Sequence, residues 1–180
     1  GDATFSGCTA LTSVSIPSSV TQIGEDSSVI GSNSFSGCKN LVSIDVAPGN
    51  LHYSSQDGVL LNADKTVLVR CPPGKSGSYA ISENITHIAS GRVSRSGGDE
   101  GAFVDCHRLT HILIPSSVHN LYSPTLFSGC SSIVSFQVDP GNQAFSSRWI
   151  STPLRSPIQP EANLRLLGEW RKGIGGHPLS

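Results

Sequence analysis

The chain repeats one short phrase four times, and this repetition restricts its fold more than any other feature. Each copy begins with Phe, has a Cys three residues later and an aliphatic residue three residues after the Cys. The copies begin at Phe5, Phe35, Phe103 and Phe127. Self-similarity of this kind is typical of arrays in which each copy forms one structural unit and packs only against its neighbours. We therefore expect a stack of units rather than one globular core.

Aligning the copies extends the phrase to Phe-Ser-Gly-Cys-x-x-Leu-x-x-Ile-x-Ile, with Val-Asp for Ser-Gly in the third copy and other apolar residues at some of the Leu and Ile positions. Apolar side chains at this spacing lie on one side of a short strand and its approach, so each unit has an apolar edge that only a neighbouring copy can bury. The expected structural core consists of Leu11, Val14, Ile16, Leu41, Ile44, Val46, Leu109, Ile112, Ile114, Ile133, Phe136 and Val138.

Two copies continue as Pro-Ser-Ser-Val, beginning at Pro17 and Pro115. Proline has no backbone N–H to donate to a sheet. We therefore expect one strand to end at Ile16 and another at Ile114.

The middle of the chain departs from the phrase. Two apolar runs, residues 59–61 and 67–70, flank the polar residues 62–66, which predicts a β-hairpin with a short turn. Residues 79–88 then return to the apolar register of residues 14–23. A hairpin embedded within the stack is therefore expected.

These residues resemble the BspA-like (Treponema pallidum type) leucine-rich repeats of bacterial and protozoan surface proteins. Residues 4–24 match that repeat nearly throughout, residues 50–88 resemble its irregular insert, and the resemblance spans about residues 2–147. It implies an α/β-type repeat solenoid of mostly short β-strands. This leucine-rich-repeat array would have a parallel concave sheet, few or no regular helices and the embedded β-hairpin.

The copies are unevenly spaced, which predicts the domain organisation. The step from Phe5 to Phe35 is longer than that from Phe103 to Phe127, which indicates an insertion near residues 25–33, and a second, rich in Gly and Ser, covers residues 89–102. Insertions in such arrays form loops on one face. We expect residues 1–147 to be a leucine-rich-repeat domain from a longer array. Residues 148–180 lie outside the repeat, as either a C-terminal cap or a disordered tail.

Composition restricts the partners. Charged residues make up 14% of the chain and the formal net charge is −1, so there is no basic surface typical of nucleic-acid or anionic-membrane binding. No apolar run approaches the roughly 20 residues that a transmembrane helix needs. We expect no nucleic-acid partner and no membrane insertion.

Four of the five cysteines occupy the same place in successive copies: Cys8, Cys38, Cys106 and Cys130. We expect buried free thiols there rather than bridges, because the repeat sets their separation and disulfide geometry is narrow. Cys71 lies outside this pattern and is expected to be the exposed or pairing thiol.

Patterns that would indicate catalysis or metal binding are weak. Cys106 and His111 are metal-ligating types, but Cys106 belongs to the inward-facing phrase whereas His111 is expected to face outward. Residues 73–76, Pro-Gly-Lys-Ser, resemble the end of a phosphate-binding loop, yet Val69 stands where that loop needs Gly. We expect no catalytic residue, no metal and no cofactor.

The remaining candidate is a surface. Residues between the inward positions are expected to face the concave side and to align between units as a ladder, which suits an extended protein partner better than a small molecule. Alternatively, they are solvated strand residues that keep the sheet soluble. The candidate ligand-binding residues are Ser13, Ser15, Ser43, Asp45, His111, Leu113, Ser135 and Gln137, with Ser78 and Ala80 in the unit between them.

The family resemblance implies a non-enzymatic, protein-binding domain of a cell-surface or secreted protein. Its partner would be an extracellular matrix or host-cell protein, and its role adhesion. The alternative is a structural spacer or coat array with no specific ligand. An enzyme built on a repeat scaffold ranks far below both.

Overall fold

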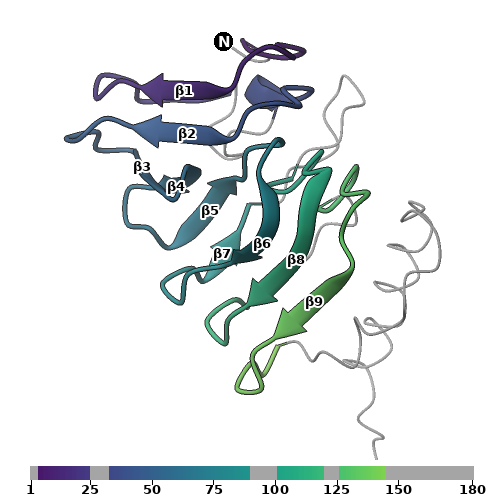
Figure 1. Ribbon diagram of the computed structural model, residues 1–180. Coiled ribbons are helices and arrows are strands. Elements are labelled where there is room, and N and C mark those ends of the chain that lie inside the picture. The colour runs from purple at the N-terminus through teal and green to yellow at the C-terminus, as the bar shows by residue number, and fades with distance from the viewer. Residues whose placement is uncertain (1–3, 25–32, 90–100, 120–125, 145–180) are drawn as a thin grey trace, which may run out of the picture.

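The computed structural model describes residues 4–24, 33–89, 101–119 and 126–144 (Figure 1). β1 and β8 end at Ile16 and Ile114, directly before the two prolines, as predicted. The elements are β1 (Ser13–Ile16), the 3-10 helix η1 (Asn33–Phe35), β2 (Ser43–Val46), β3 (Tyr53–Gln56), β4 (Val59–Asn62), β5 (Val67–Arg70), β6 (Ser76–Ala80), β7 (His87–Ile88), β8 (Arg108–Ile114) and β9 (Ser135–Val138). The predicted segment 148–180 and most of both predicted insertions lie outside the described residues.

The strands form three sheets. β1 pairs with β2 in parallel, and β6, β8 and β9 form a second parallel sheet in which the strands lie side by side (Figure 1). In each parallel pair the register joins equivalent residues, such as Val14 with Ile44 and Ile112 with Phe136. The described residues thus contain the predicted parallel pairing, but in two separate sheets rather than one.

The third sheet contains the predicted hairpin. β4 and β5 are antiparallel, with Leu61 opposite Leu68, and β7 pairs with β5 in parallel. A further strand, β3, which was not predicted, pairs with β4 through the turn at Asp57 and Gly58. Both turn residues have positive φ, 52° and 73°, the backbone conformation that favours Asp-Gly in two-residue hairpin turns.

Apolar residues of β4 and β5 are buried on both faces. Val59, Leu61 and Leu68 belong to the core cluster under β6, β8 and β9, whereas Leu60 and Val69 belong to the cluster under β1 and β2. A strand buried on both faces needs a continuous apolar run rather than an alternating one. This explains why the sequence loses its repeat pattern here.

The two parallel sheets are separated because the turn between β3 and β4 occupies the outer edge of β2. The backbone N–H of Ile44 donates to the carbonyl oxygen of Gly58 at 2.8 Å. The stacking of repeat units continues at Gly74, whose N–H donates to the carbonyl oxygen of Leu41 at 2.7 Å. The units on either side of the insert therefore meet at Leu41 and Gly74, while the turn lies between their strands.

A further copy of the phrase begins at Cys71, in the position that Phe holds elsewhere. Its N–H donates to the carbonyl oxygen of Ala102 at 2.8 Å, just as the N–H of Phe5 donates to that of Ser34. Cys71 is fully buried, so the prediction that it is the exposed or pairing thiol is wrong. The sequence concealed this copy because neither Phe nor the later Cys is present in it.

The expected core residues differ in burial according to their place in the array. Leu41, Ile44, Leu109 and Ile112 are all 0% exposed. Ile16, Ile114, Ile133 and Val138 are also buried, whereas Leu11, Val14, Val46 and Phe136 are half-buried. Leu11 and Val14 belong to the first unit, which has a neighbouring unit on one side only among the described residues.

Candidate ligand-binding face

The first part of the candidate face lies on β1 and β2. The parallel register places Ser13 beside Ser43 and Ser15 beside Asp45. Ser43 is half-buried and the other three are exposed. The Ser43 hydroxyl donates to Oδ2 of Asp45 at 2.5 Å, so these two polar groups partly satisfy each other. This part offers small polar side chains and one carboxylate.

The second part lies on β6, β8 and β9. One row contains Ser78, His111 and Ser135, and the next contains Ala80, Leu113 and Gln137. Ser135 is half-buried and the others are exposed, with Leu113 at 37%. Nδ1 of His111 lies 2.9 Å from the hydroxyl oxygen of Thr110. This part combines an aliphatic side chain with amide, imidazole and hydroxyl groups.

The two parts do not form one unbroken ladder, because the Asp57–Gly58 turn lies between β2 and β6. Nζ of Lys75 donates to the carbonyl oxygen of Asp57 at 2.6 Å, which ties the turn to the unit that follows. A guanidinium nitrogen of Arg108 lies 3.3 Å from Oδ1 of Asn40 and links the two parts at the start of the strands. The alignment of the copies did not predict the contacts of Asp57, Lys75 and Arg108. The Asp-Gly dipeptide at residues 57–58 is, however, a known signal for a hairpin turn.

Two exposed valines accompany the face and were also missed. Val42 directly precedes β2 and is 48% exposed, and Val134 directly precedes β9 and is 66% exposed. They hold equivalent places, since their N–H groups donate to the carbonyl oxygens of Thr12 and Thr110, both at 2.8 Å. The alignment of the copies could have identified both valines, because each directly follows the first aliphatic residue of its copy.

The repeated cysteines have a structural role. Sγ of Cys38 donates to the carbonyl oxygen of Phe5 at 2.9 Å, and Sγ of Cys130 donates to that of Phe103 at 3.0 Å. Cys106 makes the equivalent contact, at 3.7 Å, with the carbonyl oxygen of Cys71. Each of these thiols therefore joins its unit to the preceding one.

All five cysteines are free, but they differ in exposure. Burial raises the pKa of Cys38 and of Cys71, so both are protonated at neutral pH. Cys8 is exposed, and the prediction that it is buried is wrong. Among the described residues, no unit precedes that of Cys8 to cover it as the equivalent thiols are covered elsewhere.

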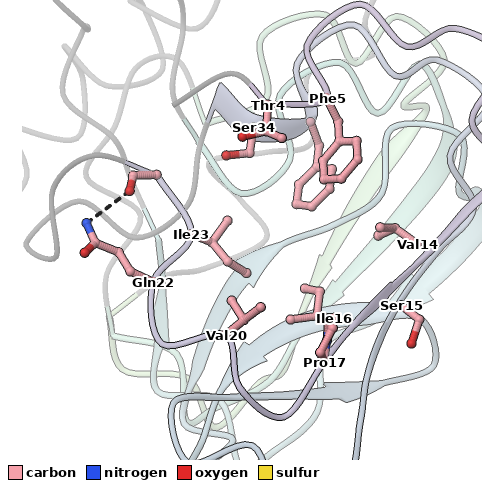
Figure 2. A pocket seen from close by; sticks show the side chains of 12 residues that line it. Thr4, Phe5, Val14, Ser15, Ile16, Pro17, Val20, Gln22, Ile23 and Ser34 are labelled. Atoms are coloured by element: carbon pink, nitrogen blue, oxygen red, sulfur yellow. Dashed lines mark hydrogen bonds between the residues drawn. The ribbon is translucent and has the colours of Figure 1, made fainter. Parts of the chain in front are cut away.

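A cavity of about 230 Å³ lies in the first unit. Figure 2 shows the apolar side chains around it, among them Phe5, Val14, Val20 and Ile23. All four are half-buried. The cavity is largely apolar and lies apart from the candidate residues of β6, β8 and β9.

The described residues contain no group of three or more His, Cys, Asp or Glu side chains that could hold a metal ion. No helix in the same part of the chain is long and apolar enough to cross a membrane. The side chains of the candidate face can contact a ligand through hydrogen bonds and by burying a small apolar area.

Comparison with known proteins gives a family match. Residues 1–57 and 76–156 match the BspA type leucine rich repeat region, in six copies. No curated protein matches the sequence. The unmatched residues between the two ranges include β4 and β5, the hairpin that departs from the repeat.

Two solved structures share the leucine-rich-repeat fold. The pneumococcal vaccine antigen PcpA is 23% identical, with a TM-score of 0.57, and the match covers 73% of this chain and 28% of that one. A leucine-rich repeat protein from Eubacterium ventriosum is 22% identical, with a TM-score of 0.50, and the match covers 76% of this chain and 41% of that one. The chain therefore matches less than half the length of either protein.

Proposed function

Because this chain belongs to the BspA-type leucine-rich-repeat family, we propose that it is a non-enzymatic, protein-binding domain of a cell-surface or secreted protein. Its ligand is an extracellular matrix or host-cell protein, and its role is adhesion. The binding surface is the candidate face, centred on Asp45, His111, Leu113 and Gln137.

The observation that carries this proposal is the row formed by Ala80, Leu113 and Gln137 across three parallel strands. Leu113 lies on the middle strand and is 37% exposed, although the residues on either side of it in β8, Ile112 and Ile114, are buried. Exposed apolar patches with a polar rim mark protein-contact surfaces, and Leu113 lies between Ala80 and the polar Gln137 in this row. The three residues lie on hydrogen-bonded strands, so binding would require little ordering of the backbone.

A surface location is supported by the relatives. One protein of similar fold is described as a vaccine antigen, a role that requires exposure to the immune system. This likeness concerns the fold, and the proposal transfers only the location to the present chain.

The second candidate is a structural spacer with no specific ligand. The observation that favours it is the hydrogen bond between Ser43 and Asp45. Through this bond, polar groups of the β1–β2 part pair with each other rather than with a protein ligand. A face whose polar groups satisfy one another remains soluble and has little to gain from binding. The spacer and adhesion proposals make opposite predictions for binding.

The test is binding to immobilised fibronectin and fibrinogen, measured by surface plasmon resonance. The binding variant carries Asp45→Lys, His111→Glu, Leu113→Glu and Gln137→Lys. A control matched in net charge carries four changes at exposed positions outside the face: Ser18→Glu, Glu83→Lys, Ser116→Glu and Gln143→Lys. Circular dichroism establishes that both variants are folded.

We expect the binding variant to lose affinity by at least about tenfold while the control binds as the parent does. Equal binding by both variants would move the site away from this face. Absence of binding by the parent chain to every matrix and cell-surface ligand tried would favour the spacer.

A further inference from the structure

Three buried cysteine thiols meet where the unit that begins at Cys71 packs against the β8 unit. Cys71 and Cys106 are 0% exposed and Cys130 is 1% exposed. The Cys106 sulfur is in hydrogen-bond contact with the thiols of both Cys71 and Cys130. All three belong to the core cluster under β6, β8 and β9, so the proposed binding face does not use them.

Cys71 and Cys106 converge on one carbonyl group. Sγ of Cys106 lies 3.7 Å from the carbonyl oxygen of Pro72, and Sγ of Cys71 lies 3.9 Å from the same oxygen. Sγ of Cys106 also lies 3.7 Å from the carbonyl oxygen of Cys71 itself. Two thiols from adjacent units are therefore held side by side in the core.

This pairing depends on the departure of one copy from the repeated phrase. The thiol of a unit elsewhere reaches the carbonyl group of a Phe in the preceding unit, as Cys130 reaches Phe103 at 3.0 Å. In the same way Cys106 reaches residue 71, where Cys stands in the place of Phe. Among the units that the structure describes, a second thiol therefore lies at this contact only here.

A buried positive charge lies close to the pair. Arg70, at the end of β5, is 1% exposed, and its Nη1 donates to the carbonyl oxygen of Gly101 at 2.7 Å. Its Nε and Nη2 have no hydrogen-bond partner among the described residues. Burial raises the pKa of the Cys106 thiol, but hydrogen bonds from its two neighbouring thiols and the charge of Arg70 outweigh burial and lower that pKa well below its usual value. The surroundings therefore favour a thiolate at Cys106.

We propose that Cys71 and Cys106 are a redox-active pair, which forms a disulfide between adjacent units when the chain meets a peroxide. The thiolate of Cys106 attacks one peroxide oxygen and the O–O bond breaks. A sulfenic acid forms, and the departing hydroxide takes up the proton that Cys106 released and leaves as water. The Cys71 thiol then attacks this sulfur, an S–S bond forms and a second water leaves. Two thiols thus lose two electrons, and one peroxide is reduced to two water molecules.

Cys71 rather than Cys130 is the partner, because the two thiols are held differently. The Cys130 thiol donates to the carbonyl oxygen of Phe103 at 3.0 Å, and a disulfide would break this hydrogen bond. The Cys71 thiol has only the 3.9 Å contact with the Pro72 carbonyl oxygen to lose. The resulting bond joins the unit after the hairpin to the β8 unit and closes a long loop, which should stabilise the fold.

The test uses the Cys8→Ser chain, in which the exposed thiol cannot link two molecules. The folded chain is exposed to hydrogen peroxide at neutral pH and then unfolded, and its remaining thiols are alkylated and its peptides identified by mass spectrometry. We expect two of the four thiols to disappear, one pair of peptides to be linked through Cys71 and Cys106, and all four thiols to return on reduction. The oxidised chain should also unfold at a higher temperature than the reduced chain.

Two further variants identify the partner of Cys106. Cys130→Ala keeps both members of the pair and should form the same bond, whereas Cys71→Ala should give no linked peptides. Circular dichroism establishes that each variant is folded. Linkage of Cys106 to Cys130 would overturn the proposal. Retention of all four thiols by the folded Cys8→Ser chain, under conditions that oxidise the unfolded chain, would also overturn it.

The role of Arg70 has a separate readout, the pH dependence of the rate of disulfide formation. We expect Arg70→Met to form the bond at least about tenfold more slowly at neutral pH, and the difference to shrink as pH rises and Cys106 ionises without the nearby charge. Arg70→Lys, which keeps a positive charge, should restore much of the rate. Equal rates for Arg70→Met and its parent at every pH would contradict this role.

Discussion

The backbone N–H of Gly74 donates to the carbonyl oxygen of Leu41 at 2.7 Å, and this contact returns the chain to the array after the inserted hairpin. A Cβ atom at position 74 would lie 2.7 Å from the carbonyl carbon of Asn40 and 2.8 Å from the carbonyl oxygen of Leu41. Both obstacles are backbone atoms and cannot rotate away. Only glycine therefore permits this close approach.

Replacement of this glycine should destabilise the fold. We expect Gly74→Ala to lower the free energy of unfolding by about 1–3 kcal/mol, because the backbone must move to relieve the overlap. Chemical denaturation measures the change. Gly141→Ala is the control, since the nearest atom to its Cβ would be a movable side-chain oxygen of Asp139. Equal stability of Gly74→Ala and the parent chain would contradict the contact.

The glycine of the repeated phrase adopts positive φ, as at Gly37 with 73°, and Asp105 holds the equivalent position in the third copy with 63°. We expect Gly37→Ala to cost about 1–2 kcal/mol because a Cβ atom disfavours this conformation. Asp105→Gly should stabilise the chain by up to about 1 kcal/mol for the same reason. Thermal and denaturant unfolding of the two variants should therefore shift in opposite directions, and a shift in the same direction would contradict the assignment.

Equivalent core positions should differ in their sensitivity to truncation. Leu41 is 0% exposed, whereas Leu11 in the same place of the first unit is half-buried. We expect Leu41→Ala to lower the free energy of unfolding by about 2–5 kcal/mol and Leu11→Ala to lower it by less. The comparison keeps residue type and repeat position constant. Equal losses would mean that the first unit is covered as fully as the second.

One cysteine of five should react in the native chain. Cys8 is exposed while Cys38, Cys71, Cys106 and Cys130 are buried. Titration with a thiol reagent should therefore modify one thiol rapidly and the other four only after denaturation. Cys8→Ser should abolish the rapid phase. A rapid phase that survives this substitution would show that a second thiol is accessible.

The buried thiols should make the fold sensitive to alkaline pH. Burial raises the pKa of Cys71 well above its usual value, so the unfolded chain loses this proton at a lower pH than the folded chain does. The associated stability is complete below the unfolded pKa of about 8.5 and is lost as pH rises from there towards the folded pKa.

This dependence has a direct test. Between pH 9 and 10.5 we expect the free energy of unfolding to fall, and Cys71→Ala to reduce the slope by up to about 1.4 kcal/mol per pH unit, the contribution of one proton. Denaturant unfolding at a series of pH values measures both slopes. The Cys8→Ser variant is the control, because it removes a thiol that is exposed in the folded chain. Identical slopes for parent and Cys71→Ala would contradict the assigned cause.

The sequence was sufficient to predict the repeating units, the strand ends at Ile16 and Ile114 and the hairpin of β4 and β5, because each depends on local spacing or on proline. It was not sufficient to predict that the parallel sheet is divided. That division depends on the hydrogen bond from Ile44 to Gly58, between residues that share no repeated pattern.

Tertiary contacts also explain the errors over two cysteines. The sequence predicts that Cys71 is the exposed or pairing thiol because it lies outside the repeated phrase, yet its backbone contacts place it in the array. Cys8 was assigned to the core because it matches the phrase, yet burial of that position depends on a preceding unit. The pattern identified equivalent positions correctly but could not show which of them have a neighbour.

The most direct test of the binding face is the affinity of two single variants for an immobilised matrix protein that the parent chain binds. Leu113→Glu changes the exposed aliphatic side chain in the middle of the three-stranded sheet, and Ser116→Glu adds the same charge in the turn after β8. We predict a Kd at least about tenfold higher for Leu113→Glu and an unchanged Kd for Ser116→Glu. Equal Kd values for the two folded variants would contradict the claim that this face binds the ligand.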